Sequence, residues 1–405
     1  MNRRIFWLLI SLLGPASAQA QLIPGAWRFE LELAPGRRLP FHIEFAQAAG
    51  GWQAWIRNAA ERLPMEAPRI QGDSVFLRTS VFNSEFRGRL LPEDRIEGVW
   101  RNYDRKTHHT LPFRAEYGVP QRFPLRPGKG RLAPVWAVTF SPGTDKAYPA
   151  VGLFTQNGSY VTGTFLTETG DYRYLEGAMD GDSLRLSAFD GSHAFLFAAG
   201  FDANGHLEGT FYSGSHWQEP WIGRPDPQAA LTDPDSLTYL LPGYERLAFS
   251  FPNPEGRMVS LADPAYQGKA VIVQVLGSWC PNCMDESKQL AAWHRRYQAE
   301  GLEIIGLAFE RTGETASSLA AIRRMKQALG LPYEVLLAST STDKALASQA
   351  LPMLNHIMAY PTAIYLDRQG RIRKIHTGYY GPGTGAYHTR FVEQYTAFIE
   401  ALLKE

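Results

Sequence analysis

Two cysteines are the only ones in the 405 residues of this chain, and they lie three positions apart in Cys280-Pro281-Asn282-Cys283. A Cys-x-x-Cys pair beside a strand and a helix is typical of thiol–disulfide redox chemistry. The alternatives are one half of a zinc site and an inert structural pair. A closed zinc site needs four ligands, and the sequence holds no second Cys-x-x-Cys and no His-x-x-x-His. The pattern therefore favours redox chemistry.

The spacing of the pair predicts a different role for each sulfur. An apolar run precedes the motif and a helix-like run follows it, so Cys280 falls just ahead of the first helical turn and Cys283 within it. A thiol at a helix N-terminus has a lowered pKa, because the helix dipole and the free amides stabilise the thiolate. We therefore expect Cys280 to attack a disulfide and Cys283, more buried, to resolve the mixed disulfide. Pro281 suits the first helical position, which needs no amide hydrogen.

The C-terminal part of the sequence resembles the TlpA/ResA-like branch of the thioredoxin superfamily and the related redoxin (AhpC/TSA-like) group. The resemblance covers about residues 245–405 and rests on segments 268–273, 279–283, 359–367 and 369–372. It implies an exported protein-disulfide oxidoreductase, acting as a disulfide reductase, with a thioredoxin-like fold. It also implies protein or small-molecule disulfide and thiol substrates, electrons from a membrane-embedded donor, and no metal or organic cofactor.

The same resemblance implies roles for residues around the cysteines. Pro361 in the segment Ala-Tyr-Pro-Thr matches a cis-proline that faces the disulfide, and Trp279 packs beside the sulfurs. Tyr360, Pro281 and Asn282 are then the residues that contact a substrate.

Segments that read alternately as strands and helices must position these residues. We expect a hairpin over 247–259, strands over 270–276, 302–309, 333–338, 362–366 and 371–377, and helices over 284–299, 315–329, 343–350 and 389–403. Such alternation predicts an α/β layer structure.

A proton carrier for the buried thiol is not obvious. Thioredoxin has a buried aspartate six residues before its first cysteine, and Gln274 stands there in this chain and cannot titrate. We expect Glu310 to carry the proton, because it ends the strand after the active-site helix, close to where the ResA-like group places a glutamate. The alternative for Glu310 is an ordinary strand-end carboxylate in water. Glu286 is a weaker candidate, because acidic residues are common in first helical turns.

Residues 21–228 are expected to be all-β. Turn dipeptides recur along this region, with alternating strands between them, which is typical of hairpins in a sandwich or barrel. Trp27 matches Trp136, and Gly72 matches Gly181, both 109 positions apart. We therefore predict a duplicated unit, with copies over 21–125 and 126–228. A proline-punctuated linker over 229–243 and the thioredoxin-like domain over 244–405 complete the multidomain organisation.

Two further segments allow two interpretations each. Arg173, His193 and His216 form either a ligand or partner surface or the charged tips of hairpin turns, which is the more ordinary case. A metal site at the two histidines is less expected still. The glycine-rich segment 378–388 is either a flexible loop beside the redox site or, more ordinarily, a plain connection.

The N-terminus predicts export. Arg3 and Arg4 precede a short apolar run over 5–13, and Ala18-Gln19-Ala20 reads as a cleavage site. We expect a signal peptide over 1–20, a bacterial periplasm or cell-envelope location, and no stable membrane anchor. The net charge of +1 gives no electrostatic reason to expect a nucleic-acid partner.

Two other functions remain open at this point. A thiol peroxidase of the redoxin type is one, although the sequence before Cys280 lacks the Pro-x-x-x-Thr/Ser-x-x-Cys setting usual for such enzymes. The other is a binding protein that uses the β-region to recognise a partner while the thiols sense redox state.

Overall fold

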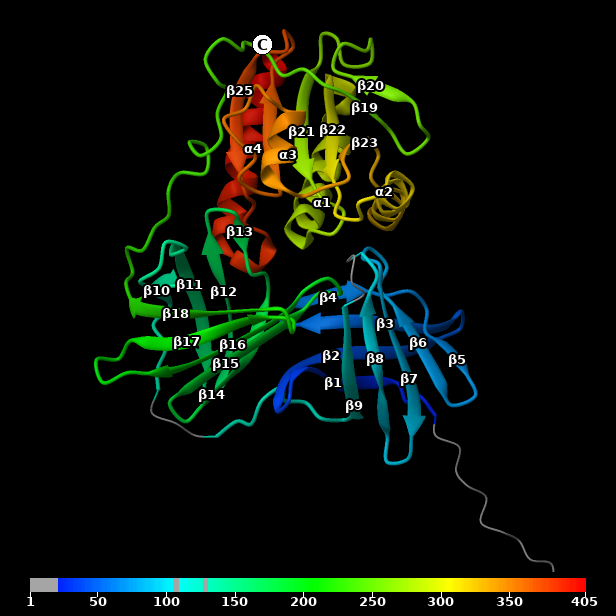
Figure 1. The fold of residues 1–405 in the computed structure, drawn as a ribbon, viewed down its shortest axis with the longest axis vertical. Coiled ribbons are helices and arrows are strands. Elements are labelled where there is room, and N and C mark those ends of the chain that lie inside the picture. The colour runs from blue at the N-terminus through cyan, green and yellow to red at the C-terminus, as the bar shows by residue number, and fades with distance from the viewer. Residues whose placement is uncertain (1–20, 105–108, 127–129) are drawn as a thin grey trace, which may run out of the picture.

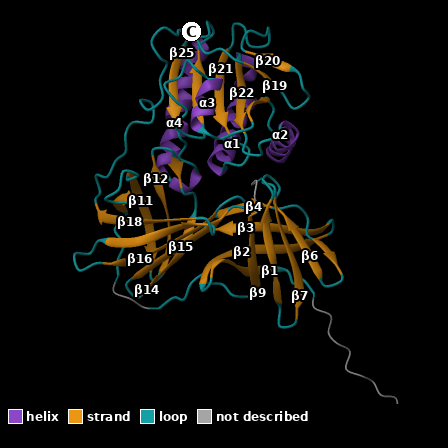
Figure 2. Ribbon diagram, viewed as in Figure 1, coloured by secondary structure: helices purple, strands orange, loops and turns teal. Residues whose placement is uncertain are grey.

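The computed structural model describes residues 21–104, 109–126 and 130–405. The expected signal peptide over 1–20 lies outside these residues. In the described part, Figure 1 shows two β-sheets side by side and a domain with helices packed over them. Figure 2 shows that the helices belong to this third unit. The architecture is an all-β N-terminal region followed by an α/β domain, as the sequence predicts.

The first sheet of the described β-region has the order β4-β3-β2-β1-β9-β8-β7-β6-β5. Its neighbouring strands pair antiparallel throughout, as hairpin connections require. Its strands are β1 (Gly25–Ala34), β2 (Arg37–Ala48), β3 (Gly51–Asn58), β4 (Glu61–Pro64), β5 (Arg69–Gln71), β6 (Ser74–Arg78), β7 (Ser84–Leu91), β8 (Arg95–Asn102) and β9 (His109–Tyr117).

The second sheet has the order β11-β10-β18-β17-β16-β15-β14-β12-β13, and β11 also pairs with β12. Matching β1–β9 with β10–β18 in chain order gives the same strand neighbours in both sheets. The second sheet has one further pairing, β12 with β14, which closes it into a barrel. Its strands are β10 (Val135–Phe140), β11 (Tyr148–Asn157), β12 (Tyr160–Thr167), β13 (Gly170–Asp171), β14 (Leu175–Asp180), β15 (Ser183–Phe189), β16 (Ala194–Phe201), β17 (Leu207–Ser213) and β18 (Trp217–Pro225).

Alternating burial explains why these segments form strands. In β1 the buried side chains are Trp27, Phe29, Leu31 and Leu33, and in β10 they are Trp136, Val138 and Phe140. Intervening residues point to the other face, because side chains of a strand alternate with a period of two. The residues that match along the sequence are thus core residues at equivalent places.

The two sheets are packed against each other. Phe41 of β2 stacks on Phe189 of β15, with ring centroids 4.4 Å apart. The buried guanidinium of Arg122 donates to the Ser187 carbonyl at 2.8 Å and to Asn58 Oδ1 at 3.2 Å, which joins the sheets through hydrogen bonds as well. The β-region is therefore one packed unit.

The C-terminal sheet has the order β23-β22-β21-β24-β25. β21, β22 and β23 are parallel, and β24 and β25 are antiparallel to their neighbours. Every residue of the central β21 is buried, as expected for a strand covered on both faces. The elements are β19 (Ser250–Pro252), β20 (Met258–Ser260), β21 (Ala270–Leu276), α1 (Pro281–Tyr297), η1 (Gln298–Glu300), β22 (Leu302–Phe309), α2 (Thr315–Leu329), β23 (Glu334–Ser339), α3 (Lys344–Ala350), β24 (Thr362–Leu366), β25 (Ile372–Thr377), η2 (Pro382–Thr384) and α4 (Ala386–Lys404).

The second half of the expected linker packs against this domain. Asp235 accepts a hydrogen bond from His376 Nδ1 at 2.7 Å and pairs with Lys374 Nζ at 2.9 Å. The amide of Thr377 in β25 donates to the Pro234 carbonyl at 3.0 Å. These bonds extend the edge of the sheet, so the chain is already fixed to the C-terminal domain about ten residues before position 244.

Candidate active site

Cys280 lies at the junction of the central strand and the first helix. Leu276 ends β21, Pro281 begins α1, and Cys280 is the N-cap residue with an extended backbone. Its Sγ accepts a hydrogen bond from the Cys283 amide at 3.2 Å, and its thiol donates to the Tyr360 carbonyl at 3.3 Å. An N-cap side chain normally receives a free amide of the first turn, and in this chain a sulfur fills that role.

The two sulfurs differ in exposure. Cys280 is 6% exposed and Cys283 is fully buried. Burial raises the pKa of the Cys283 thiol well above its usual value, and the hydrogen bond and charge of Cys280 act in the same direction. Cys280 is thus the sulfur that a substrate can reach, and Cys283 is held as a thiol behind it.

The segment around Pro361 lies against Cys280. The Tyr360–Pro361 peptide bond is cis and Pro361 is buried. The Tyr360 ring meets the Trp279 ring edge to face, with centroids 5.7 Å apart. Trp279 is held by a hydrogen bond from its Nε1 to the Phe309 carbonyl at 2.9 Å. The structure therefore brings Trp279, Tyr360 and Pro361 together beside Cys280.

Pro281 and Asn282 face the β-region. The Pro281 carbonyl accepts a hydrogen bond from Arg173 Nη1 at 3.0 Å. The Asn282 side chain donates to the Asp171 carbonyl at 3.0 Å. Two of the three residues expected to contact a substrate are thus bonded to another part of the same chain.

Glu310 lies close to the site but is bonded elsewhere. It is buried, and its carboxylate accepts hydrogen bonds from the Ser278 amide at 2.9 Å and the Ser278 hydroxyl at 2.7 Å. Burial raises the pKa of Glu310 to about 7, although the two hydrogen bonds from Ser278 act in the opposite direction and lower it. Glu310 is not a strand-end carboxylate in water. Its two oxygens hold the turn before Cys280, and neither bonds a cysteine.

The acid that faces Cys283 is Glu286. It lies three residues after Cys283 on α1, which places both on one helix face. Its Oε2 accepts a hydrogen bond from Gln274 Nε2 at 2.8 Å, and its Oε1 has no hydrogen-bond partner among the described residues. Burial raises its pKa to about 8, and its charge is one of the causes that raise the pKa of Cys283.

Gln274 connects the acid to the helix. Its Nε2 also lies 3.4 Å from the Cys283 carbonyl, and its Oε1 accepts a hydrogen bond from Ser287 at 2.9 Å. The non-titrating residue at the position of the thioredoxin aspartate therefore orients a titrating one. The sequence argument against Glu286, that acids are common in first helical turns, does not apply, because α1 begins at Pro281 and Glu286 lies beyond its first turn. The three-residue spacing from Cys283 is the signal that points to Glu286.

The three polar residues singled out in the β-region have different surroundings. Arg173 is buried and reaches out to α1. His193 is paired with Asp190 at 3.4 Å, and His216 packs edge to face against His109, with ring centroids 5.3 Å apart. Within the described residues no three His, Cys, Asp or Glu side chains are grouped to hold a metal ion.

The glycine-rich segment makes a close contact with the β-region. Gly378 has a φ of +79°, and a Cβ there would lie 3.0 Å from the Thr169 carbonyl carbon. The Gly381 amide donates to Asp171 Oδ2 at 2.5 Å. This segment is thus neither a free loop nor a plain connection, because it forms part of a contact between domains.

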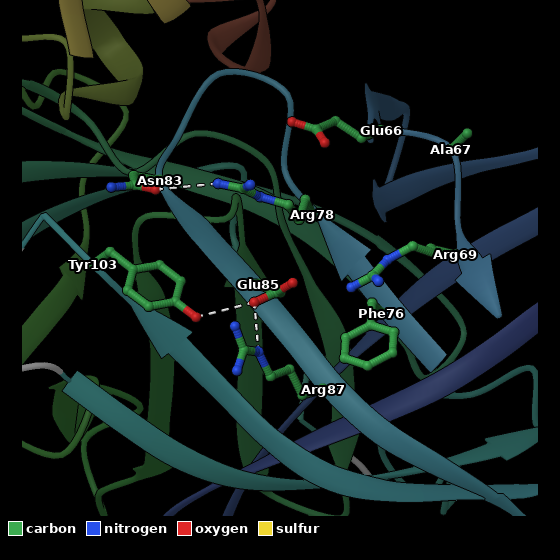
Figure 3. A pocket seen from close by; sticks show the side chains of 9 residues that line it. All are labelled: Glu66, Ala67, Arg69, Phe76, Arg78, Asn83, Glu85, Arg87 and Tyr103. Atoms are coloured by element: carbon green, nitrogen blue, oxygen red, sulfur yellow. Dashed lines mark hydrogen bonds and ion pairs between the residues drawn. The ribbon is translucent and has the colours of Figure 1, made fainter. Parts of the chain in front are cut away.

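A separate cavity of about 680 Å³ lies over β5 to β8. In Figure 3, Glu85 lies between Tyr103 and Arg87, to which it is hydrogen-bonded at 3.0 and 2.7 Å. None of the residues around Cys280 lines it. The lining residues are Glu66, Ala67, Arg69, Phe76, Arg78, Asn83, Glu85, Arg87 and Tyr103.

Comparison with known proteins shows what the domain around Cys280 is similar to. Residues 242–375 match the model of the AhpC/TSA family. The thiol-disulfide oxidoreductase ResA of Geobacillus thermodenitrificans is 27% identical over 124 residues, which cover 31% of this chain and 62% of that protein. The thiol:disulfide interchange protein DsbE of Pseudomonas aeruginosa is 28% identical over 141 residues, or 35% of this chain and 69% of that protein.

The chain thus spans between 62% and 69% of the length of these two curated relatives. A solved structure of a thioredoxin-family thiol:disulfide interchange protein from Chlorobium tepidum is 21% identical, with 37% of this chain and 94% of that chain covered, at a TM-score of 0.28. The family match and the curated relatives confirm the resemblance that the motif around Cys280 predicts: the C-terminal domain is similar to redoxins of the TlpA/ResA-like type.

Proposed function

We propose that this chain catalyses thiol–disulfide exchange at Cys280 and Cys283, as a disulfide reductase. The observation that carries the proposal is the pairing of an N-cap sulfur that is 6% exposed with a second, fully buried sulfur one turn on. The similarity of residues 242–375 to redoxins, and of this part of the chain to proteins named thiol-disulfide oxidoreductases, supports it.

The exchange has two steps. The Cys280 thiolate attacks one sulfur of a substrate disulfide, so that a mixed disulfide forms and the other substrate sulfur leaves as a thiolate. Cys283 then loses its proton and attacks Cys280 Sγ, which releases the second substrate thiolate. The substrate gains two electrons and two protons, and Cys280 and Cys283 become a disulfide.

Glu286 is the residue that we assign to the proton of Cys283. Water has no direct access to a fully buried thiol, and a nearby acid with a pKa near the working pH is an effective proton carrier. Glu286 is buried beside Cys283 and has one carboxylate oxygen without a partner among the described residues. Glu310 supports the reaction indirectly, because it fixes the Ser278 turn that leads to Cys280.

Export and an electron donor belong to the same proposal. The leader-like sequence over 1–20 favours export to a bacterial periplasm or cell envelope. A disulfide reductase there needs electrons from a membrane-embedded donor. In the described residues no helix is both long and apolar enough to cross a bilayer.

We also infer that the β-region arose by duplication. The equal order of β1–β9 and β10–β18, together with the repeated spacing of 109 between Trp27 and Trp136, supports this inference. The extra pairing of β12 with β14 in the second sheet is then a difference that developed between the copies.

A single-turnover experiment tests the proposed function. Reduced protein is mixed with glutathione disulfide, and the chain is analysed by intact mass under acid quench. We expect the loss of two hydrogens per chain and the release of reduced glutathione. Hydrogen peroxide is tested in parallel, and a chain oxidised by peroxide but inert to disulfides would indicate a thiol peroxidase instead. A chain that shows no catalytic turnover with either oxidant but binds a cell-envelope protein tightly would favour the binding protein instead.

A further inference from the structure

The β-region bonds to the residues on both sides of Cys280. Asn282 donates to the Asp171 carbonyl at 3.0 Å, Arg173 donates to the Pro281 carbonyl at 3.0 Å, and the Ser192 hydroxyl donates to the Trp279 carbonyl at 2.9 Å. We propose that the β-region is a fixed cover on the substrate face, which excludes disulfides in folded proteins and admits low-molecular-weight disulfides. This inference rests on the proposed exchange reaction and names its substrate class.

Arg173 fastens the cover to the active-site helix. Its guanidinium is 4% exposed and forms ion pairs with Asp285 of α1 and Glu61 of β4, so it joins both β-sheets to the N-terminal part of the active-site helix. A buried charge that loses its partner is strongly destabilising. The contact is therefore held in place, unlike the loose interface between domains joined only by a linker.

The β12–β13 hairpin covers a second stretch of the face. Gly170 approaches the active site so closely that a Cβ would lie 2.3 Å from Asn282 Nδ2 and 3.4 Å from the Tyr379 carbonyl oxygen. The Tyr380 hydroxyl donates to the Thr167 carbonyl at 3.2 Å. This hairpin thus fills the space between the Cys280 turn and the segment after β25.

A second loop of the β-region covers the opposite flank. Asp190 accepts hydrogen bonds from the Ser192 amide at 2.8 Å and the His193 amide at 2.7 Å, which fixes the loop. Ser192 then contacts Trp279, whose ring lies 5.0 Å below the Arg311 guanidinium. Trp279 and Tyr360 stay partly exposed, and the Tyr360 carbonyl lies 3.3 Å from Cys280 Sγ.

The bonded backbone explains the proposed selectivity. A folded protein that offers a disulfide from its surface must lie across the peptide groups on both sides of Cys280. The carbonyls of Trp279 and Pro281 are already bonded to the β-region. A small disulfide needs only to reach Cys280 Sγ past Trp279 and Tyr360.

Access to Cys280 can be measured without any exchange activity. The reduced full chain is alkylated with iodoacetamide and, separately, with a large polyethylene-glycol maleimide. For each reagent, the alkylation rate of the native chain is divided by the alkylation rate of the chain unfolded in urea. We expect the large reagent to be slowed at least about tenfold more than the small one, because it reacts only with the undocked chain. Equal slowing of both reagents would contradict the proposal that the β-region covers Cys280.

Variants of Arg173 test whether the contact is the cause. Loss of a buried charge partner shifts a docking equilibrium by about 100-fold or more, so Arg173→Met should raise the large-reagent rate at least about tenfold. Arg173→Lys keeps the charge and should restore most of the exclusion. Arg87→Met is the matched control, because this exposed arginine pairs with Glu85 in the β-region far from the cysteines. Circular dichroism checks that each variant is folded.

Substrate rates complete the test. We expect glutathione disulfide to oxidise the parent chain at least about tenfold faster than insulin does. In Arg173→Met the rate with insulin should rise toward the rate with glutathione disulfide, and the rate with glutathione disulfide should change much less. A parent chain that is oxidised by insulin as fast as by glutathione disulfide would overturn the inference. A chain inert to both disulfides but still size-selective in alkylation would refute the proposed function and leave the cover standing.

Discussion

Gln274 Nε2 lies 2.8 Å from Glu286 Oε2 and 3.4 Å from the carbonyl oxygen of Cys283. One amide side chain thus joins the buried acid to the helix turn that carries Cys283. The amide cannot titrate, so it can orient the acid at any pH. In the proposed reaction Glu286 carries the proton, and Gln274, at the position of the thioredoxin aspartate, orients Glu286.

Glu286→Gln should slow the resolving step. The substitution keeps the size of the side chain and removes its proton-carrying ability, so the mixed disulfide should persist and the rate of its resolution near pH 7 should fall by about 10²-fold. Quenched-flow mass analysis of the mixed disulfide with glutathione measures this rate. Glu310→Gln is the matched comparison and should have the smaller effect, because Glu310 bonds Ser278 and no cysteine. A larger effect of Glu310→Gln than of Glu286→Gln would assign the proton transfer to Glu310 instead.

The stability of the protein should fall between mildly acidic and mildly alkaline pH. The pKa of Glu286 is raised from 4.5 to about 8 in the folded chain, so in this range the folded state keeps a proton that the unfolded state has lost. The free energy of unfolding therefore decreases as pH rises from about 4.5 to about 8. Urea unfolding of the parent and of Glu286→Gln at several pH values measures the slope. The variant should show the shallower slope, and an unchanged slope would contradict the buried acid.

Cys280 should be alkylated in the native protein while Cys283 is protected. Cys283 is fully buried and its pKa is raised, so both its access and its thiolate fraction are low. Peptide mapping after a brief exposure of the reduced chain to iodoacetamide locates the label. Label on Cys283 ahead of Cys280 would reverse the proposed roles of the two sulfurs.

Arg173→Met should destabilise the chain by about 3–5 kcal/mol, because it leaves Asp285 and Glu61 buried without their cation. The free energy of unfolding should fall clearly less in Arg173→Lys than in Arg173→Met. Urea unfolding followed by tryptophan fluorescence gives both values. A loss near zero for Arg173→Met would mean that the ion pairs are solvated and that the β-region is only loosely attached.

The elements of the C-terminal domain could be predicted from the sequence. The expected bounds are correct for the strands over 270–276 and 302–309 and for the helix over 315–329. Continuous apolar runs indicate the strands, and apolar residues that recur with a period of 3.6 indicate the helix; both are local features of the sequence. The helix ending at Lys404 begins three residues before the expected position 389, since no capping side chain marks its start.

The contacts that define the site could not be predicted in the same way. Arg173 lies 112 positions from Asp285 and 112 positions from Glu61, and no periodicity links such distant residues. From the sequence, a charged turn tip is the more ordinary of the two interpretations of Arg173, whereas in the structure this side chain is buried and paired with Asp285 and Glu61. The burial of Glu286 depends on what packs over α1, which a single helix does not reveal.

Trapping of the mixed disulfide tests the proposed division of roles between the two sulfurs most directly. Reduced Cys283→Ser and Cys280→Ser variants are each mixed with glutathione disulfide and analysed by intact mass and peptide mapping. The proposed roles require that Cys283→Ser accumulates a stable glutathione adduct on Cys280, while Cys280→Ser, whose remaining thiol is fully buried, stays unmodified. An adduct on Cys283 in the Cys280→Ser variant, with none in Cys283→Ser, would contradict them.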